Sequence, residues 1–158
     1  MQRIKLKLDL TQNTYENFPE CTPVFYEMIG DLASTMYDAY YFTPDFEGDS
    51  LNDFKKEIAN VFSGLYGEFM PELSFVVEGE DAINSGLLLC IYKDEPTITY
   101  LFTSPMAQRQ GLAKNLLATC CDKLKQIGFT SLYVYLNLEN TPAYNLFELF
   151  GFDEVPIK

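Results

Sequence analysis

The stretch from Thr103 to Lys114 combines residue types that could bind an anionic ligand. It runs from the end of an apolar strand pattern through a short turn into the start of an amphipathic helix pattern. Such a junction exposes unpaired backbone N–H groups and the positive end of a helix dipole, which together bind phosphate groups. Gly111 lets an anion approach the main chain closely, and Arg109 and Lys114 add positive charge. Gly111 taken alone is better explained as a packing glycine in an ordinary strand-to-helix connection.

Histidine is absent from the sequence, and its absence excludes whole classes of chemistry. Ser-His-Asp and Cys-His catalysis and histidine-ligated zinc all need an imidazole, and we expect no metal site. The four cysteines form no C-x-x-C pair, and the adjacent Cys120 and Cys121 lie within a helical pattern, which indicates packing and not a disulfide framework. A reducing cytoplasm fits this cysteine usage best.

The charge balance is strongly acidic, with 23 acidic and 11 basic side chains and a formal net charge of -12. This charge repels phosphate backbones, so it argues against general binding to nucleic acid or to anionic membranes. No apolar run approaches the roughly 20 residues that a membrane span needs, and the alternation from Met1 to Leu10 indicates a strand and not a signal peptide. The acidity would attract a cationic partner, although keeping a small cytoplasmic protein in solution is the simpler explanation.

No linker-like stretch divides the 158 residues, so we expect a single domain over residues 1-158. Alternation and turn signals predict strands at Met1 to Leu10, Leu73 to Glu78, Gly86 to Tyr92, Thr97 to Thr103, Leu132 to Leu136 and Phe152 to Pro156, with a turn at Lys93 to Pro96. Helical spacing and cap signals predict helices at Thr22 to Tyr40, from the Ser50–Asp53 capping box to near Gly67, at Leu112 to Ile127 and at Thr141 to Phe150. This order predicts an α/β fold, with a central mixed and mostly antiparallel sheet and helices on both of its faces.

Two segments in the second half of the chain resemble motifs of the GNAT superfamily of acetyltransferases. The motif Gln108-x-x-Gly111-x-Ala113 resembles the Q/R-x-x-G-x-G/A loop with which that superfamily binds pyrophosphate. The segment from Asn140 to Phe152 resembles the N-x-x-A-x-x-(L/F)-Y-x-x-x-G-F segment near the C-terminus of its members. Two motifs in the right order are much more specific than either one alone, and the resemblance extends over roughly Ser74 to Val155.

The resemblance implies an N-acetyltransferase that transfers an acetyl group from acetyl-CoA directly to an amine, in a small molecule or in a peptide or protein. It implies a GNAT-like fold, the amine acceptor as the main partner and, as a further partner to consider, a second copy of the chain in a homodimer. The cofactor-binding residues that it implies are Leu101, Phe102, Thr103, Gln108, Arg109, Gln110, Gly111, Leu112, Ala113, Lys114, Asn140 and Phe147. Main-chain N–H groups from Gln108 to Lys114 would hold the pyrophosphate, and Leu101 to Thr103 would pair with the pantetheine arm.

The sequence departs from the family pattern where many members have a tyrosine that protonates the departing thiolate. Phe147 stands there, and Tyr144, on the same helix face, is the candidate to replace it as the catalytic acid. Thr97 stands where some members have a catalytic glutamate, which leaves Tyr100, Glu78 and Glu95 as weaker candidates. The missing tyrosine motivates an alternative from another class, in which a CoA-binding protein of this fold acts as a sensor or partner subunit with little or no catalysis.

An acidic loop between the first two predicted helices is the candidate acceptor site. It carries Asp45, Glu47 and Asp49 and follows Tyr40 and Tyr41. The family resemblance places part of the acceptor cleft at this loop, so Tyr41 and Asp45 are the predicted substrate-binding residues. A charged loop is more often simply solvated, and that interpretation stays open.

Overall fold

The computed structural model describes residues 2–41 and 43–157, so Met1 of the first predicted strand and Phe42 lie outside the described residues. The strands are β1 Arg3–Asp9, β2 Cys21–Pro23, β3 Glu68–Phe69, β4 Phe75–Glu78, β5 Ile83–Tyr92, β6 Glu95–Thr103, β7 Ser131–Asn137 and β8 Asp153–Val155. The helices are α1 Ile29–Tyr40, α2 Leu51–Phe62, α3 Leu112–Gln126 and α4 Thr141–Phe150, with short 3₁₀ turns at Tyr26–Met28, Pro71–Leu73 and Pro105–Ala107. None of the helices in the described part of the chain is both long and apolar enough to cross a membrane.

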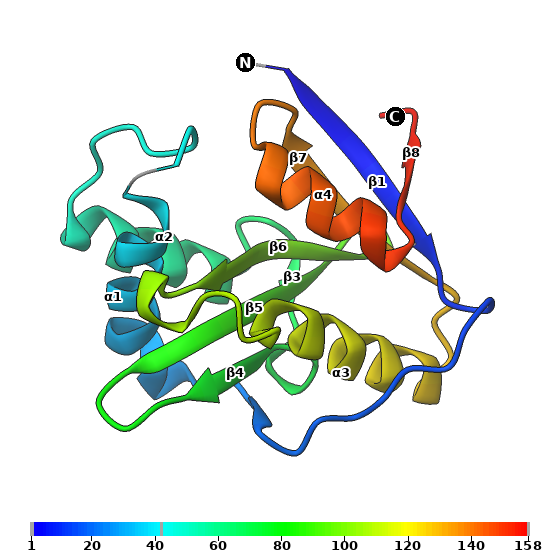
Figure 1. Cartoon of the computed structure of the whole chain (residues 1–158), viewed down its shortest axis with the longest axis horizontal. Coiled ribbons are helices and arrows are strands. Elements are labelled where there is room, and N and C mark those ends of the chain that lie inside the picture. Colours follow the sequence, from blue (N-terminus) through cyan, green and yellow to red (C-terminus); the bar gives the residue numbers. More distant parts are fainter. Residues whose placement is uncertain (1, 42, 158) are drawn as a thin grey trace.

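The strands form one twisted sheet in the order β2-β4-β5-β6-β7-β1-β8, with β3 paired to β5 (Figure 1). All pairs are antiparallel except β6 with β7, which run parallel because α3 connects them. The mixed, mostly antiparallel sheet of the prediction is confirmed. The one parallel pair lies inside the sheet, with β5 beside β6 and β1 beside β7.

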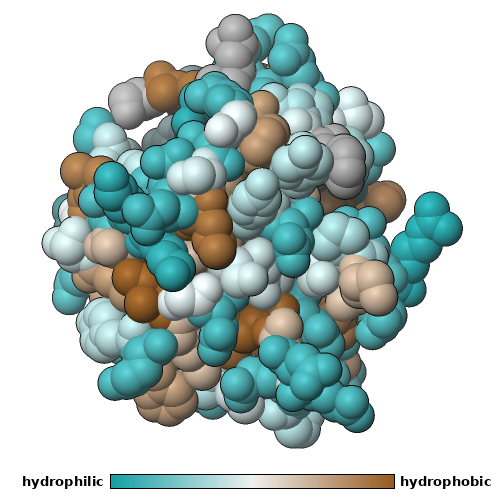
Figure 2. Space-filling model, turned by 90° about the vertical axis from the view of Figure 1, so that its left-hand side faces the viewer, coloured by the Kyte–Doolittle hydropathy of each residue, from teal (hydrophilic) through white to brown (hydrophobic). Residues whose placement is uncertain are grey.

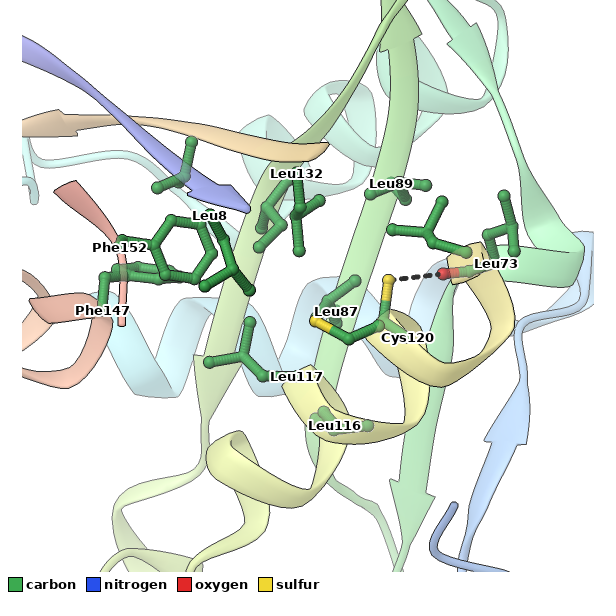
Figure 3. Packing of buried hydrophobic residues seen from close by; sticks show 14 of the residues in the cluster. Leu8, Leu73, Leu87, Leu89, Leu116, Leu117, Cys120, Leu132, Phe147 and Phe152 are labelled. Carbon is green, nitrogen blue, oxygen red and sulfur yellow. Dashed lines mark hydrogen bonds between the residues drawn. The ribbon is translucent and has the colours of Figure 1, made fainter. Parts of the chain in front are cut away.

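Helices cover both faces of the sheet and divide the core in two (Figure 1). On one face α3 packs on the sheet through mostly aliphatic side chains, and α4 packs through Phe147. Figure 3 shows Leu116 and Leu117 of α3 against Leu87 and Leu89 of β5, with the Cys120 thiol bonded to the Leu73 carbonyl at 3.5 Å. On the other face α1 and α2 pack through a core rich in aromatic rings. The four cysteines are all buried and unpaired, as packing residues would be.

Local chemistry explains where several elements begin and end. Ser50 and Asp53 form the predicted capping box, with Asp53 N–H donating to Ser50 Oγ at 3.1 Å and Ser50 N–H to Asp53 Oδ2 at 2.9 Å. Helix α4 begins at the Asn140 cap and ends at Gly151, whose φ of 118° only glycine adopts without strain. The predictions for α3 and α4 are therefore confirmed nearly residue for residue.

The predicted helix from Thr22 to Tyr40 is wrong in its first part. Cys21–Pro23 is a strand, β2, which pairs antiparallel with β4 at the edge of the sheet, and α1 begins only at Ile29. Proline is tolerated in an edge strand because its missing N–H is not needed on the free side. The Thr-Pro pair is equally typical of a helix start, and only the partner strand, more than 50 residues away, decides between the two.

Two further differences between prediction and structure concern where an element begins or ends. Helix α2 ends at Phe62 and not near Gly67, because Gly64 and Gly67 have φ values of 96° and 111° and turn the chain into β3. The predicted turn at Lys93 to Pro96 is shorter, since Lys93 and Asp94 alone form it with φ values of 51° and 65°. Strands β2 and β3 are thus additions to the predicted order, each paired to a distant strand.

Candidate active site

The central parallel pair opens into a fork. Strands β6 and β7 pair at Thr97 with Tyr133 and at Ile98 with Val134, and each then continues toward its C-terminal end. At the same level the register between β5 and β6 shifts, since Leu88 pairs with Tyr100 but Leu89 with Ile98. This leaves Thr99 as the extra residue of a β-bulge, which bends the strand. The bend explains how two neighbouring strands of one sheet come to separate.

A cleft of about 1060 Å³ lies at this fork, at the upper end of the range that ligand pockets occupy. Its walls come from both strands, from α1, α2 and α4, and from the loops around them. The lining residues include Tyr40, Asp45, Glu57, Tyr66, Thr97, Tyr100, Leu101, Phe102, Thr103, Gln108, Asn140 and Phe147. Figure 2 views the side of the molecule on which α1 and α2 lie and shows a mostly hydrophilic surface with smaller hydrophobic patches.

The loop before α3 has the backbone geometry of an anion site. Gly111 adopts the left-handed conformation with φ 75° and ψ 16°, and Arg109 does so with φ 66°. The first bond of the helix is from Asn115 N–H to the Gly111 carbonyl at 3.0 Å, so the N–H groups of residues 112–114 have no acceptor within the helix. A Cβ placed on Gly111 would meet nothing within 4 Å, which leaves open space beside the loop. The residues present therefore fit a phosphate group.

The predicted cofactor residues fall into two sets. Leu101, Phe102, Thr103, Gln108, Asn140 and Phe147 line the cleft. Arg109, Gln110, Gly111, Leu112, Ala113 and Lys114 form the adjoining loop and first turn of α3 and are exposed or half-buried. Strand β6 leads from the cleft directly into that turn, so the two sets are continuous along the chain.

Asp45 and Asn140, predicted for different ligands, contact each other. Asn140 Nδ2 donates to Asp45 Oδ2 at 2.8 Å, and Asn137 Nδ2 donates to Asp45 Oδ1 at 3.0 Å. Asn140 Oδ1 meanwhile accepts from Ala143 N–H at 3.3 Å as the cap of α4. The acidic loop is therefore attached across the fork to the end of β7, and Asp45, Glu47 and Asp49 all line the cleft.

Tyr41 and Tyr144 lie elsewhere, because neither is among the residues that line the cleft. Tyr41 packs its ring against Tyr37 at 5.8 Å and Phe46 at 5.0 Å between centroids. Tyr144 packs against the aliphatic core, and a hydrogen bond from its hydroxyl to Glu148 raises its pKa. Phe147 does line the cleft, with its ring 5.1 Å from that of Phe152. The roles assigned to Tyr41 and Tyr144 stay predictions.

The candidates for the general base, Tyr100, Glu78 and Glu95, also differ in whether they line the cleft. Tyr100 and Thr97 line the cleft, whereas Glu78 and Glu95 are not among its lining residues. Glu95 instead forms an ion pair with Lys5, with 2.8 Å between Lys5 Nζ and Glu95 Oε1. This pairing gives Glu95 a structural partner away from the fork.

A carboxylate that no motif marks lies in the cleft wall. Glu57, on α2, accepts hydrogen bonds from the hydroxyl of Tyr66, at 2.8 Å to Oε1 and 2.7 Å to Oε2, and from the hydroxyl of Tyr100 on β6. Burial is the larger cause and the hydrogen bond to Glu57 the smaller one, and together they raise the pKa of Tyr66 to about 12. The same two causes raise the pKa of Tyr100. Both phenols therefore stay protonated at neutral pH.

Sequence reasoning missed Glu57, although one signal was available. The residue lies three positions after Phe54 and directly before Ile58, at the border of the buried stripe of α2. A carboxylate at that border is half-buried when its helix packs on a sheet, whereas one on the opposite face is solvated. The signal is too common among amphipathic helices to identify a site by itself.

The described lining of the cleft is strongly acidic. It includes the five carboxylates of Asp45, Glu47, Asp49, Asp53 and Glu57, against one guanidinium, that of Arg3. A wall with this excess of negative charge attracts cations and disfavours an anionic acceptor beside the anionic cofactor. Within residues 2–41 and 43–157, no group of three or more Cys, Asp or Glu side chains is arranged to hold a metal ion.

Comparison with known proteins gives a consistent picture. The sequence profile of the Acetyltransferase (GNAT) family matches residues 31–152, which is most of the chain. The [Ribosomal protein bS18]-alanine N-acetyltransferase of Escherichia coli strain K12 is 35% identical over 65 residues, which cover 41% of this chain and 44% of that protein. The match thus spans less than half the length of that curated relative.

Solved structures share the fold. The ribosomal-protein-S18-alanine N-acetyltransferase from Escherichia coli superposes with a TM-score of 0.68 at 20% identity, covering 86% of this chain and 78% of that one. The PaiA N-acetyltransferase from Thermoplasma acidophilum, solved in complex with coenzyme A, gives a TM-score of 0.68 at 14% identity over 87% of this chain and 91% of that one. At these identities the likeness concerns the fold.

Proposed function

Since the chain belongs to the Acetyltransferase (GNAT) family, we propose that it is an N-acetyltransferase that transfers the acetyl group of acetyl-CoA directly to an amine. The observation that carries the proposal is the fork of β6 and β7 at the Thr99 bulge, whose cleft adjoins the anion-binding first turn of α3. Acetyl-CoA supplies an activated acetyl thioester when it is bound. The residues of the chain then have to hold both partners, exclude water and manage one proton.

We place the cofactor along β6 and at the start of α3. The N–H groups of residues 112–114 and the positive end of the α3 dipole would hold the pyrophosphate, with Arg109 and Lys114 adding charge. Leu101 to Thr103 would present main-chain groups to the pantetheine arm, because the separation from β7 leaves this edge of β6 inside the cleft. Phe147 and Asn140 line the same cleft.

We place the acceptor on the side of the cleft formed by α1, α2 and the acidic loop. Five lining carboxylates favour a cationic acceptor, and an amine is cationic at neutral pH. The name of the Escherichia coli relative specifies an alanine of a ribosomal protein, so a peptide with a free amino-terminal alanine is the first acceptor to test, beside small amines. Asp45 would act here by holding the loop to Asn137 and Asn140.

The test of the cofactor site uses the stability of the protein. Acetyl-CoA at 100 times its Kd should raise the free energy of unfolding by about 2.7 kcal/mol, and Gly111→Glu should abolish the gain because a carboxylate would occupy the anion site. Gly111→Ala is the matched control, since it carries the same backbone strain at φ 75° without the charge. It should keep most of the gain. An unchanged gain in Gly111→Glu would contradict the placement.

A second candidate function is favoured by one observation, which is that Phe147 lines the cleft where the family has its tyrosine. In that case the protein binds acetyl-CoA but acetylates nothing, and it acts as a sensor or partner subunit. Release of CoA thiol in the presence of an amine panel separates the two. Tight acetyl-CoA binding without turnover on any amine would favour this second function.

A further inference from the structure

The cluster of Glu57, Tyr66 and Tyr100, here called the carboxylate–tyrosine cluster, brings together three elements on the acceptor side of the cleft. Glu57 belongs to α2, Tyr66 to the turn after it and Tyr100 to the part of β6 just beyond the bulge. All three side chains are half-buried and line the cleft. A catalytic role for this cluster rests on the proposed function, because it concerns the proton that acetyl transfer to an amine must remove.

The hydrogen bonds of the cluster fix the direction of the Tyr100 hydroxyl. A carboxylate only accepts, so the hydroxyls of Tyr66 and Tyr100 both donate their protons to Glu57. The Tyr100 oxygen is then left with lone pairs and no proton to offer to a ligand in the cleft. Its raised pKa keeps it a neutral phenol in this arrangement. Tyr100 can therefore only accept a hydrogen bond from the acceptor.

Tyr100 lies on the side of β6 where an acceptor would arrive. Its side chain packs with the α1/α2 core, whereas that of its neighbour Leu101 packs with the α3/α4 core, as alternation along a strand requires. The main chain that continues from it, Leu101 to Thr103, is the segment proposed to hold the pantetheine arm. Tyr100 thus directly precedes the segment proposed to hold the pantetheine arm. Its side chain lies on the side of the strand that faces away from the α3/α4 core.

Among the described residues, Arg3 is the one cationic side chain that lines the cleft in which the cluster lies. In the part of the chain that the structure describes, no Lys or Arg forms an ion pair with Glu57. The titratable groups that face Tyr100 and Glu57 are Tyr40 of α1, with its ring 6.2 Å from that of Tyr100, Tyr66, and along the cleft Asp45 and Asp53. All are phenols or carboxylates. Neighbours of this kind favour a cationic ligand beside the cluster.

We infer that Tyr100 is a catalytic residue that takes a proton from the acceptor amine, and that Glu57 is the positioning residue that receives the proton of Tyr100 in turn. The amine N–H bond breaks as the new O–H bond of Tyr100 forms, and the old O–H bond of Tyr100 breaks as Glu57 Oε2 is protonated. The electron pair freed on the nitrogen of the ammonium group forms the C–N bond to the acetyl carbon, and the C–S bond breaks to release the thiolate of CoA. The second proton that the nitrogen must lose to become an amide passes to this thiolate, which leaves as the thiol. The hydrogen bond from Tyr66 keeps the Glu57 carboxylate in position, and Glu57 returns its proton to water in the cleft.

The test compares pH profiles of kcat and KM, with acetyl-CoA and a short peptide carrying a free amino-terminal alanine as the probe. General base catalysis is worth on the order of 100-fold or more, so Glu57→Gln and Tyr100→Phe should each lower kcat by about that factor at pH 7. The loss should shrink as pH rises toward the pKa of the peptide amine, because hydroxide then removes the proton unaided. KM for acetyl-CoA should stay as in the parent. Tyr66→Phe should have a smaller effect, since it leaves the Tyr100 bond in place.

Asp31→Asn is the control matched in charge, because Asp31 is exposed on α1 and does not line the cleft. It should keep the parent rates and profile. A uniform loss at every pH in both Glu57→Gln and Tyr100→Phe, or no loss, would overturn the inference, and Tyr100→Phe decides alone if Glu57→Gln does not fold. An inactive parent that still binds acetyl-CoA would instead refute the proposed function, and this inference with it, whereas an active parent with unchanged variants refutes the inference only.

Discussion

The two faces of the sheet are built from different residues, although both are covered by two helices. The face under α3 is mostly aliphatic, with Leu116, Leu117 and Leu124 fully buried against leucines of the strands, whereas α4 on the same side adds the ring of Phe147. Its cysteine thiols are kept protonated, since burial raises the pKa of Cys121 to about 12 and also raises the pKa of Cys21 and of Cys120. The face under α1 and α2 is aromatic, and its hydroxyls reach into a cleft.

This contrast explains why the chemistry is expected on one face and the cofactor's anion on the other. Aliphatic side chains fill space without polar groups, so α3 can bury a whole face and still present its N-terminal turn to an anion. Tyrosines fill space and also carry a polar end, so the α1/α2 face can pack and hold a proton-transfer group at once. The contact of Tyr40 with both Phe54 and Tyr100 joins these two roles. Substitutions at four places in the molecule test the contrast between the faces.

The largest effect is expected on the aliphatic face. Leu117→Ala removes a side chain with no exposed surface and should lower the free energy of unfolding by about 2–5 kcal/mol. Leu149→Ala, on α4 with 87% of its residue surface exposed, is the control and should stay within about 0.5 kcal/mol of the parent. Denaturant unfolding measures both. Equal values would show that the leucine face is not the main source of stability.

The next effect is expected beside the cleft. A Cβ on Gly86 would lie 2.8 Å from the ring of Phe102, so Gly86→Ala should cost about 1–3 kcal/mol by overpacking. Because Phe102 lines the cleft, the displaced ring should also weaken acetyl-CoA binding, measured by titration calorimetry. Gly30→Ala meets nothing within 4 Å in helix α1 and should be neutral or slightly stabilising. If the affinity for acetyl-CoA is unchanged in Gly86→Ala, Phe102 does not contribute to the cofactor site.

A smaller effect is expected at the start of α2. Ser50→Ala removes the oxygen that accepts from Asp53 N–H and should cost about 1 kcal/mol. Hydrogen bonds from the Ser50 backbone and side chain lower the pKa of Asp53, so its contribution is present above the unfolded pKa and is lost as pH falls through the folded value. Asp53→Ala should therefore flatten the acid side of a stability–pH curve. If the stability–pH curve of Asp53→Ala is as steep as that of the parent, the protonation of Asp53 is not coupled to folding.

The smallest effect is expected at Phe147. Phe147→Tyr adds a single oxygen in the cleft wall, where the family has a tyrosine, so kcat should be kept or raised. Tyr144→Phe should leave kcat unchanged if Tyr144 lies outside the reaction, as its place outside the cleft lining indicates. Rates at several pH values measure both. A large loss in the first variant alone would mean that the wall at Phe147 has no room for a hydroxyl.

Features that depend on neighbouring residues could be predicted from the sequence. The periodicity from Leu112, the Ser50–Asp53 capping box, the helix start at Thr141 and the glycine at 151 each involve residues within one or two helical turns. Local energetics of this kind is visible in a window of the chain. The same holds for the loop motif from Gln108 to Ala113, whose backbone conformation depends on its own glycine and the helix after it.

Features that depend on partners far along the chain emerged only in the folded molecule. Cys21–Pro23 is a strand because β4 pairs with it, and Asp45 contacts Asn140 across 95 residues. Glu57 contacts Tyr100 across 43 residues because α2 packs on the sheet beside the bulge at Thr99. Helical periodicity shows that Glu57 borders a buried stripe but not which strand the stripe covers. The packing of distant elements sets how much water such a carboxylate keeps, and a local window of the sequence does not contain that information.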